Sequence, residues 1–343
     1  MMDYDLSLLS RWSDGMIQGK QVFVTGAGGF IASHLIERLI DAGAQVRAFV
    51  RYNSRSDVGL LHQLSPDVFS KINVVAGDLR DPETIRTAMK DIDTIFHLGA
   101  LIAIPYSYLH PREVVETNVM GTLNIMMVAR ELRIRRVVHT STSEVYGTAQ
   151  YVPIDENHPL QGQSPYSASK IGADKIVESF YRSFNVPVIT VRPFNTYGPR
   201  QSARAVIPTI ITQALTRDEV HLGSLDPSRD FTFVSDTVDG FMRCAQAEDV
   251  IGEEINLGND ATITIGELCD KIFYILGKSP KIVTESQRMR PEKSEVLKLQ
   301  ASYKKAHRLI GWKPKTSLDD GLRKTIEWIS NHLMLYQPNE YTV

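Results

Sequence analysis

The sequence has few of the residues that build disulfide-bonded, zinc-binding or membrane-spanning proteins. Only two cysteines, Cys244 and Cys269, occur in 343 residues, and neither has a partner at the short spacing of a metal site. Both lie in apolar stretches with helical spacing, where a buried free thiol is expected. No apolar run approaches the ~20 residues of a membrane span. We therefore expect a cytoplasmic protein with no metal and no membrane partner.

Charge of one sign is also lacking. The 38 Lys and Arg residues nearly balance 40 Asp and Glu residues, for a net charge of -2, which gives no reason to expect nucleic acid as a partner. Residues 1–20 begin with acidic side chains and lack the charged-then-apolar pattern of a signal peptide. We expect them to form an arm that packs on the body of the protein.

Short Val- and Ile-rich runs alternate with longer segments of helical spacing between Gln21 and Pro193. This pattern predicts an α/β fold of the Rossmann type, a parallel sheet buried on both faces and doubly wound by helices. The predicted strands are Val22–Thr25, Val46–Val50, Ile72–Ala76, Thr94–Leu98, Arg136–Thr140 and Val186–Val191. The main predicted helices are Ile31–Asp41, Val114–Leu132 and Tyr166–Phe184.

The alternation weakens after Pro193, which predicts a smaller α/β C-terminal lobe that caps the sheet. We divide the chain into an arm (1–20), a dinucleotide-binding domain (21–193), this lobe (194–335), which can interleave with the first domain, and a tail (336–343). Within the lobe we expect strands at Val220–Leu222, Asp230–Phe233 and Glu254–Leu257, and helices at Ile207–Leu215, Ile265–Leu276, Tyr303–Leu309 and Leu318–Asn331.

A glycine-rich turn joins the first predicted strand to the first predicted helix. Its sequence from Thr25 to Ala32 contains Gly26, Gly28 and Gly29. Gly26 permits a tight turn, Gly29 lets the backbone approach a pyrophosphate, and Ala32 allows close helix–strand packing. Amides at the start of the helix then face the phosphates. The turn therefore predicts a dinucleotide site.

The residues after the second strand indicate which dinucleotide binds. NAD sites usually place an acid there for the ribose 2′-hydroxyl, whereas this chain has Arg51, Ser54 and Arg55. These side chains suit a 2′-phosphate and favour NADP, although an arginine that stacks on adenine would admit NAD equally. Asp78, after the third strand, is predicted to accept a hydrogen bond from the adenine amino group.

Tyr166 and Lys170 stand one turn apart at the start of a predicted helix. The lysine ammonium can lower the tyrosine pKa toward neutrality and hold a ribose hydroxyl, so that Tyr166 takes a proton from a substrate alcohol during hydride transfer. Thr142 and Ser143 follow the fifth strand at its carboxyl end, where ligands bind in such sheets, and Thr142 is predicted to hydrogen-bond the reacting oxygen.

These motifs, together with Pro193–Pro199, Arg229–Phe231 and Arg290–Glu292, resemble the extended short-chain dehydrogenase/reductases that act on nucleotide sugars. The resemblance runs from Val22 to about Ile329. It implies further cofactor contacts at Phe30, Ile31, Leu79, Leu98, Ala100, Asn118 and Pro193. It also implies that the nucleotide-diphosphate sugar contacts Ile104, Tyr106, Asn195, Arg204, Val206, Ile207, Arg229 and Arg290. Arg204 could equally be a surface residue.

Glu144 bears on the reaction. In the family that the chain resembles, epimerases usually carry a small or neutral residue here, whereas a carboxylate can reach C5 of the sugar. Once C4 is a ketone, Glu144 could remove the C5 proton as the C6 hydroxide departs, and hydride returned to C6 would give a 4-keto-6-deoxy sugar. Glucose-type dehydratases have Thr-Asp-Glu where this chain has Thr142, Ser143 and Glu144, so the acid that protonates the leaving hydroxyl is left open between Ser143 with water and Glu144.

Two longer stretches, Ala100–Tyr108 and Val145–Gln163, resemble N-acetylglucosamine 4,6-dehydratases of the legionaminic-acid type. The resemblance implies UDP- or GDP-N-acetylglucosamine as substrate, with an apolar Ile102–Pro105 wall beside the acetamido methyl group. A C4 epimerase, a UDP-glucuronate decarboxylase and a dehydratase that releases a 5,6-ene product stay open. A sensor without activity is disfavoured, because such a protein would tend to lose Tyr166, Lys170 or Glu144.

The helices Val114–Leu132 and Tyr166–Phe184 carry apolar residues on more than one face, including Met126, Met127 and Val128. In the family that the chain resembles, the two helices pair across a twofold axis, so a homodimer is expected. Packing against the N-terminal arm is the alternative. His97 and His139 end predicted strands and are expected to be packed rather than catalytic.

Overall fold

The structure is a computed structural model that describes residues 17–289 and 291–336. Within these residues the centre is a seven-stranded, all-parallel sheet with the strand order β11-β6-β5-β4-β1-β2-β3. This arrangement confirms the predicted fold class. The strands are β1 (Gln21–Thr25), β2 (Gln45–Arg51), β3 (Ile72–Gly77), β4 (Thr94–His97), β5 (Arg136–Thr140), β6 (Val188–Pro193) and β11 (Glu254–Leu257).

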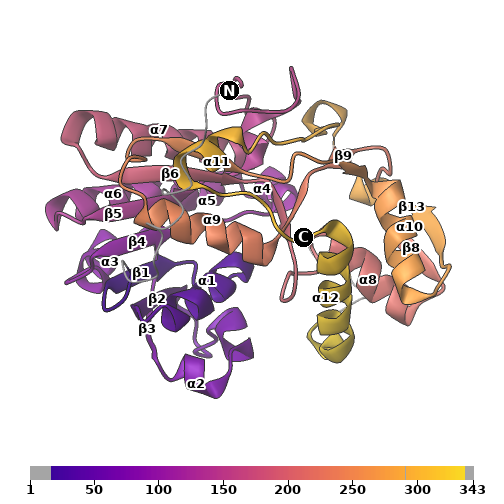
Figure 1. The fold of residues 1–343 in the computed structure, drawn as a ribbon, viewed down its shortest axis with the longest axis horizontal. Coiled ribbons are helices and arrows are strands. Elements are labelled where there is room, and N and C mark those ends of the chain that lie inside the picture. The colour runs from indigo at the N-terminus through magenta and orange to yellow at the C-terminus, as the bar shows by residue number, and fades with distance from the viewer. Residues whose placement is uncertain (1–16, 290, 337–343) are drawn as a thin grey trace.

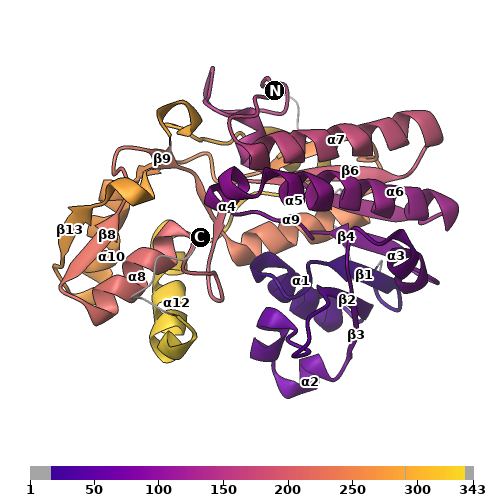
Figure 2. The ribbon, with the colours of Figure 1, turned by 180° about the vertical axis from the view of Figure 1, so that it is seen from behind.

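Helices cover both faces of the sheet (Figures 1 and 2). Val22 and Val24 of β1 pack into the same cluster as Leu35 of α1, whereas Phe23, between them, packs into a second cluster with Ile85. This alternation is the period of two that a strand buried on both faces requires. One layer contains α1 (Phe30–Asp41) and α9 (Val234–Gln246), and the other contains α3 (Pro82–Ala88), α6 (Gly121–Glu131) and α7 (Pro165–Phe184).

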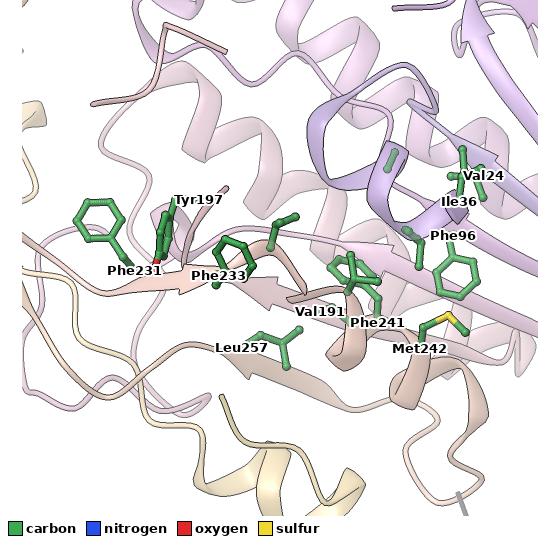
Figure 3. Close-up of a cluster of buried hydrophobic side chains, with 14 of the residues drawn as sticks. Val24, Ile36, Phe96, Val191, Tyr197, Phe231, Phe233, Phe241, Met242 and Leu257 are labelled. Carbon is green, nitrogen blue, oxygen red and sulfur yellow. The ribbon is translucent and has the colours of Figure 1, made fainter. Parts of the chain in front are cut away.

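A smaller lobe lies beside the sheet, at the right of Figure 1. It contains α8 (Val206–Thr216), α10 (Ile265–Leu276), α12 (Leu318–Asn331) and the parallel pair β8 (Glu219–Leu222) and β13 (Lys281–Thr284). Two further pairs, β7 (Asn195–Tyr197) with β10 (Phe231–Phe233) and β9 (Ser228–Arg229) with β12 (Ile263–Thr264), link it to the body. Figure 3 shows the apolar core continuing from Phe96 and Phe241, at the sheet, to Tyr197 and Phe233.

The chain beyond Pro193 serves both parts of the molecule. Glu254–Leu257, predicted as a strand of the lobe, forms β11 and extends the main sheet by pairing with β6. The strand predicted at Asp230–Phe233 forms β10, which begins one residue later at Phe231, and Asp230 separates it from β9. The predicted arm lies outside the described residues except for Ile17–Lys20, and the tail lies outside them except for Tyr336.

The helix predicted at Val114–Leu132 is continuous but changes from α-helical to π-helical geometry and back. It consists of α5 (Pro111–Val115), a π-helical segment (Glu116–Met120) and α6. A π segment turns the side chains after it to a new direction and is frequent at functional sites. Asn118 lies within this segment.

Several short elements complete the fold. The remaining α-helices are α2 (Pro66–Phe69), α4 (Ile104–Leu109) and α11 (Lys304–Ile310). Short 3-10 turns lie at Gly59–Gln63, Ser143–Tyr146, Ser286–Arg288, Glu292–Ser294 and Leu333–Leu335.

Local sequence explains where α7 begins. Ser164 accepts a hydrogen bond from the Ser167 amide, the Ser167 hydroxyl accepts one from the Ser164 amide, and Pro165 occupies the first helical position. This reciprocal pair is a capping box, and it fixes the first turn of the helix, which carries Tyr166.

We predict that Ser164→Ala lowers the free energy of unfolding by about 1 kcal/mol, because the Ser167 amide loses its capping acceptor. Ser317→Ala is the matched control, since Ser317 caps α12 by accepting from the Asp320 amide and its loss should cost a similar ~1 kcal/mol. Urea unfolding of the two variants measures both values. An unchanged free energy of unfolding in Ser164→Ala would show that the capping box does not stabilise the start of α7.

Candidate active site

The glycine-rich turn lies at the carboxyl end of β1, as predicted, and neighbouring backbone packs against it. Gly26 has φ +65°, and a Cβ at this residue would lie 2.8 Å from the Gly99 backbone. A Cβ on Gly28 would lie 2.7 Å from the Val58 carbonyl oxygen. The turn therefore admits no side chain at either position.

The start of α1 has the chemistry of an anion site. Gly29 is the N-cap residue and has no side chain with which to cap the helix. Phe30 and Ile31 form the first turn, where amides lack partners within the helix. These amides suit a pyrophosphate, so the residues present fit a dinucleotide.

The loop after β2 is held by its own hydrogen bonds. The Asn53 side-chain oxygen accepts from the amides of Arg55 and Asp57, and Ser54 and Arg55 are exposed. Arg51 lies 3.6 Å from the Glu113 carboxylate. The Arg51 guanidinium, which was predicted to bind a 2′-phosphate, therefore already faces the Glu113 carboxylate. This contact was not predicted from the sequence.

Asp78 was predicted to bind adenine, and its carboxylate pairs with Arg80 at 2.6 Å. The side-chain hydrogen bond from Arg80 lowers the pKa of Asp78. Leu79 packs beside Gly99 and Gly121, where a Cβ would lie 2.7 Å and 2.9 Å from its side chain. Leu79 therefore lies between the start of α6 and the segment after β4 and contacts both.

Asn118 organises the segment that contains Leu98 and Ala100. Its side-chain oxygen accepts from the Leu101 amide at 2.8 Å, and its amide nitrogen donates to the Leu101 carbonyl and to the Ser169 hydroxyl, both at 2.9 Å. Asn118 is buried. In this structure its side chain therefore fixes Leu101, at the end of the 98–101 segment, against Ser169 of α7.

His97 is packed, as expected, and lies within a polar network. Its ring bonds the Thr25 hydroxyl at 2.8 Å and the Thr122 hydroxyl at 3.0 Å. The Thr25 hydroxyl also accepts from the Gly99 amide. Burial holds the pKa of His97 well below its usual value, so the ring is neutral and fixes the carboxyl ends of β1 and β4.

The structure brings Thr142, Glu144, Tyr166 and Lys170 together. A hydrogen bond joins the Tyr166 hydroxyl to Thr142, and the Thr142 hydroxyl accepts from the Glu144 amide at 3.2 Å. The Lys170 ammonium donates to the Thr140 carbonyl at 2.7 Å. Tyr166 and Lys170 are buried, whereas Glu144 is half-buried.

The direction of the Tyr166 pKa differs from the expectation. Burial raises it above its ordinary value, and the nearby Glu144 carboxylate raises it further, against a lowering by the Thr142 hydrogen bond. Burial also lowers the pKa of Lys170 to about 8. Desolvation of both groups thus outweighs the effect of the lysine charge that the sequence predicted.

Ser143 is buried. It stands between Thr142 and Glu144 in the 3-10 turn Ser143–Tyr146, which places the two neighbours toward Tyr166 and turns Ser143 inward. Ser143 is therefore more buried than Thr142 and Glu144, which are both half-buried.

Sequence reasoning missed a buried ionic group behind these residues. The Asp174 carboxylate accepts from the Ser141 hydroxyl at 2.8 Å and from Arg192 at 3.1 Å, and it lies 3.2 Å from the His139 ring. All four side chains are almost fully buried. The signals were Asp174 one turn after Lys170 and an arginine in the apolar strand β6.

Three predicted substrate residues lie near the start of the smaller lobe's sequence, and the predicted cofactor residue Pro193 precedes them. Asn195 begins β7, and its Nδ2 atom is buried with no hydrogen-bond partner among the described residues. Val206 and Ile207 begin α8. Pro193 ends β6, and the next amide donates to the Leu257 carbonyl.

Other predicted substrate residues have protein partners or lie at the surface. Arg229 is buried and pairs with Glu295 at 3.0 Å, while Arg204 is exposed. Ile104 is buried at the start of α4, and the Tyr106 hydroxyl donates to Glu113 at 2.5 Å. Arg290 lies outside the described residues.

Two negative findings apply to the described part of the chain. No group of three or more His, Cys, Asp or Glu side chains there could hold a metal ion. No helix there is long and apolar enough to cross a membrane.

The fold and the Tyr166–Lys170 pair define a nucleotide-sugar enzyme of the extended short-chain dehydrogenase/reductase class. Residues 23–325 match the family model described as GDP-mannose 4,6 dehydratase, and the chain belongs to this family of nucleotide-sugar dehydratases and epimerases.

Relatives show how broad the family is. The chain is 30% identical to the dTDP-D-glucose 4,6-dehydratase of Mus musculus, over 90% of this chain and 88% of the relative. It is 32% identical to the UDP-glucuronic acid decarboxylase 2 of Arabidopsis thaliana, over 89% and 67%. Among solved structures, DesIV, a dTDP-glucose 4,6-dehydratase of Streptomyces venezuelae with NAD and TYD bound, aligns with a TM-score of 0.81 at 27% identity, over 93% of this chain and 100% of that one.

We predict that the buried ammonium of Lys170 makes stability depend on pH. Its pKa falls from 10.5 to about 8 on folding, so between these values the unfolded chain binds more protons and stability rises with pH. Below pH 8 the whole cost of burying the charge is present. Relative to Lys170→Met, the wild-type free energy of unfolding should rise by about 3 kcal/mol across this range. Denaturant unfolding at several pH values measures the difference, and a difference that does not change would contradict the assignment.

Proposed function

We propose that the protein is a 4,6-dehydratase that converts UDP- or GDP-N-acetylglucosamine to the 4-keto-6-deoxy sugar. The observation that carries the proposal is the Glu144 carboxylate beside Tyr166 and Thr142. Tyr166 serves an alcohol at C4, and Glu144 adds a base that can serve the neighbouring carbon C5. An epimerase acting only at C4 has no use for this second base.

The cofactor of the proposed reaction is a nicotinamide dinucleotide. When bound, it accepts a hydride from C4 and returns one at C6. Gly26, Gly28 and Gly29 with the first turn of α1 would hold its pyrophosphate, and Tyr166 and Lys170 its nicotinamide-side ribose.

We further propose NAD rather than NADP, although Arg51, Ser54 and Arg55 alone favour NADP. Glu113 lies 3.6 Å from Arg51 and would repel a 2′-phosphate held by that guanidinium. The Streptomyces relative was solved with NAD, which supports the same choice.

Each residue has a defined role in the proposed reaction, and Glu144 acts twice. Tyr166 takes the proton from the C4 hydroxyl, whose oxygen Thr142 orients, and Lys170 favours the phenolate by its charge. The C4 ketone acidifies C5, and Glu144 removes the C5 proton. Hydroxide leaves C6 with a proton donated by the Glu144 carboxylic acid, so that one water is lost. Because Ser143 is buried, we assign this proton to Glu144. C6 then receives the hydride taken from C4, C5 takes a proton from solvent, and Tyr166 releases its proton to solvent.

The apolar residues after β4 support the acetamido sugar. Ile104 is buried within the protein, whereas Ile102 is 59% exposed, so Ile102 is the side chain of this segment with apolar surface to offer. An acetamido methyl group is a suitable occupant of such a surface.

We also propose a homodimer through the α5–α6 run and α7. Met127 is 51% exposed and Phe184 44%, although both belong to helices whose other sides are packed in the core. A second copy of these helices would cover the apolar side chains.

The first test is the product formed from UDP-N-acetylglucosamine in deuterium oxide, with NAD and no reductant. We predict loss of one water, with one solvent deuterium at C5, seen by mass spectrometry and NMR. Inversion at C4 without loss of mass would make the enzyme an epimerase, and loss of water with C5 and C6 unsaturated would make it the 5,6-ene enzyme. The GDP sugar and UDP-glucuronate are the parallel substrates, and carbon dioxide from the latter would indicate a decarboxylase.

Glu144→Gln should slow water loss and C5 exchange by about 10²- to 10⁴-fold, the usual contribution of a general base. Oxidation at C4 should survive, because Thr142, Tyr166 and Lys170 remain, and the reduced nicotinamide should accumulate. Glu83→Gln, which changes an exposed carboxylate of α3, is the control. Full dehydration by Glu144→Gln would remove the basis of the proposal.

A further inference from the structure

The helix α7 contacts the end of β5 at four successive residues. Asp174 bonds the Ser141 hydroxyl and the His139 ring, Lys170 donates to the Thr140 carbonyl, and Tyr166 bonds Thr142. The three helix residues are four apart and share one face. Tyr166 and Lys170 have tasks in the proposed reaction, but Asp174 has none.

Arg192 connects Asp174 to the turn that carries Glu144. From β6, its Nη2 atom donates to the Asp174 carboxylate at 3.1 Å, and its Nη1 atom donates to the Tyr146 hydroxyl at 3.1 Å. The guanidinium also lies 5.3 Å from the centre of the Tyr146 ring. The hydrogen bonds of Arg192 to Asp174 and to Tyr146 are therefore both buried, and together they fix the orientation of the guanidinium.

Tyr146 ends the 3-10 turn Ser143–Tyr146, two residues after Glu144. It is fully buried, and its hydroxyl donates to the side-chain oxygen of Asn256 at 2.7 Å. Asn256, on β11, donates in turn to the Ile154 carbonyl at 3.3 Å. The end of the turn is thus fixed by hydrogen bonds to β6 and β11.

Burying the charged side chains of Arg192 and Asp174 costs free energy. Removing Arg192 and Asp174 from water costs more than an apolar pair of the same volume would, so such pairs are weak sources of stability. Their buried polar contacts do set a single geometry. Lys170 adds a second positive charge to that of Arg192. The partly exposed Glu254 carboxylate, 3.0 Å from Arg192, adds a second negative charge to that of Asp174.

We propose that Asp174, Arg192 and Tyr146, named here the Asp174–Arg192–Tyr146 network, position Glu144 relative to Tyr166. The network joins the helix that carries the oxidation residues to the turn that carries the elimination base. These three are positioning residues, since they contact neither the sugar nor the cofactor in the proposed reaction. The inference rests on the proposed function and adds residues for its second step.

Tyr146→Phe is the sharpest test, because it removes only a hydroxyl and keeps the buried ring. Tyr336→Phe is the matched control: the Tyr336 hydroxyl is another buried donor, to the Gln201 carbonyl, near the C-terminus. Both variants and the wild type are mixed rapidly with UDP-N-acetylglucosamine in deuterium oxide. Absorbance of the reduced nicotinamide reports C4 oxidation, and deuterium at C5 reports elimination. Thermal unfolding of each variant shows that it is folded.

We expect Tyr146→Phe to slow C5 exchange by about 10- to 100-fold while C4 oxidation stays within about twofold, as displacement of one reacting group predicts. Reduced nicotinamide should therefore accumulate in Tyr146→Phe and not in Tyr336→Phe. Equal slowing of both steps, or no slowing of either, would overturn the inference and leave the dehydratase intact. A wild type that neither loses water nor exchanges C5 would overturn the proposed function, and the inference with it.

Discussion

The docking of α7 on the end of β5 is the contact on which the candidate active site depends. The Lys170 ammonium on the Thr140 carbonyl and the Asp174 carboxylate on the Ser141 hydroxyl fix the helix along the strand. Because α7 starts at a capped turn beside Tyr166, its register also decides where the phenol lies relative to Thr142. A shift by one residue would remove all of these contacts together.

Features set by neighbours in the sequence were predictable. Gly26 adopts a positive φ in the tight turn that its sequence motif predicts, and Pro165 marks the start of α7. The Val-rich runs bury side chains alternately on the two faces of the sheet. The sheet and the approximate site could therefore be predicted from the local sequence pattern. Even α3, which was not among the predicted helices, has a signal in the sequence, since Asp81 caps it before Pro82.

Partners far apart in the sequence were not predictable. Glu113 against Arg51 and Arg192 against Asp174 join residues 62 and 18 positions apart, and a single sequence carries no signal for such pairs. The contacts of Asn118 with Leu101 and Ser169 also join residues 17 and 51 positions apart. Likewise β11 lies between β8 and α10 of the lobe in sequence and joins the main sheet in space.

The smaller lobe is joined to the catalytic side by the segment after residue 291. The Ser294 hydroxyl bonds Tyr108 of α4 at 2.6 Å, the Lys293 carbonyl accepts from Gln163 at 3.3 Å, and Glu295 pairs with Arg229. Residues 293–295 thus contact α4, the segment before Tyr166 and Arg229 of the lobe. The two parts of the proposed substrate site are therefore held together by the protein itself.

The most direct test of the account follows one hydrogen atom. UDP-N-acetylglucosamine carrying deuterium at C4 is incubated with the enzyme and NAD in ordinary water, and the product is examined by NMR. The account predicts that the deuterium moves to C6 of a product that has lost water, because Tyr166 and Glu144 act on adjacent carbons of one bound sugar. Deuterium returned to C4 of an intact sugar would contradict the account and assign the site to epimerisation.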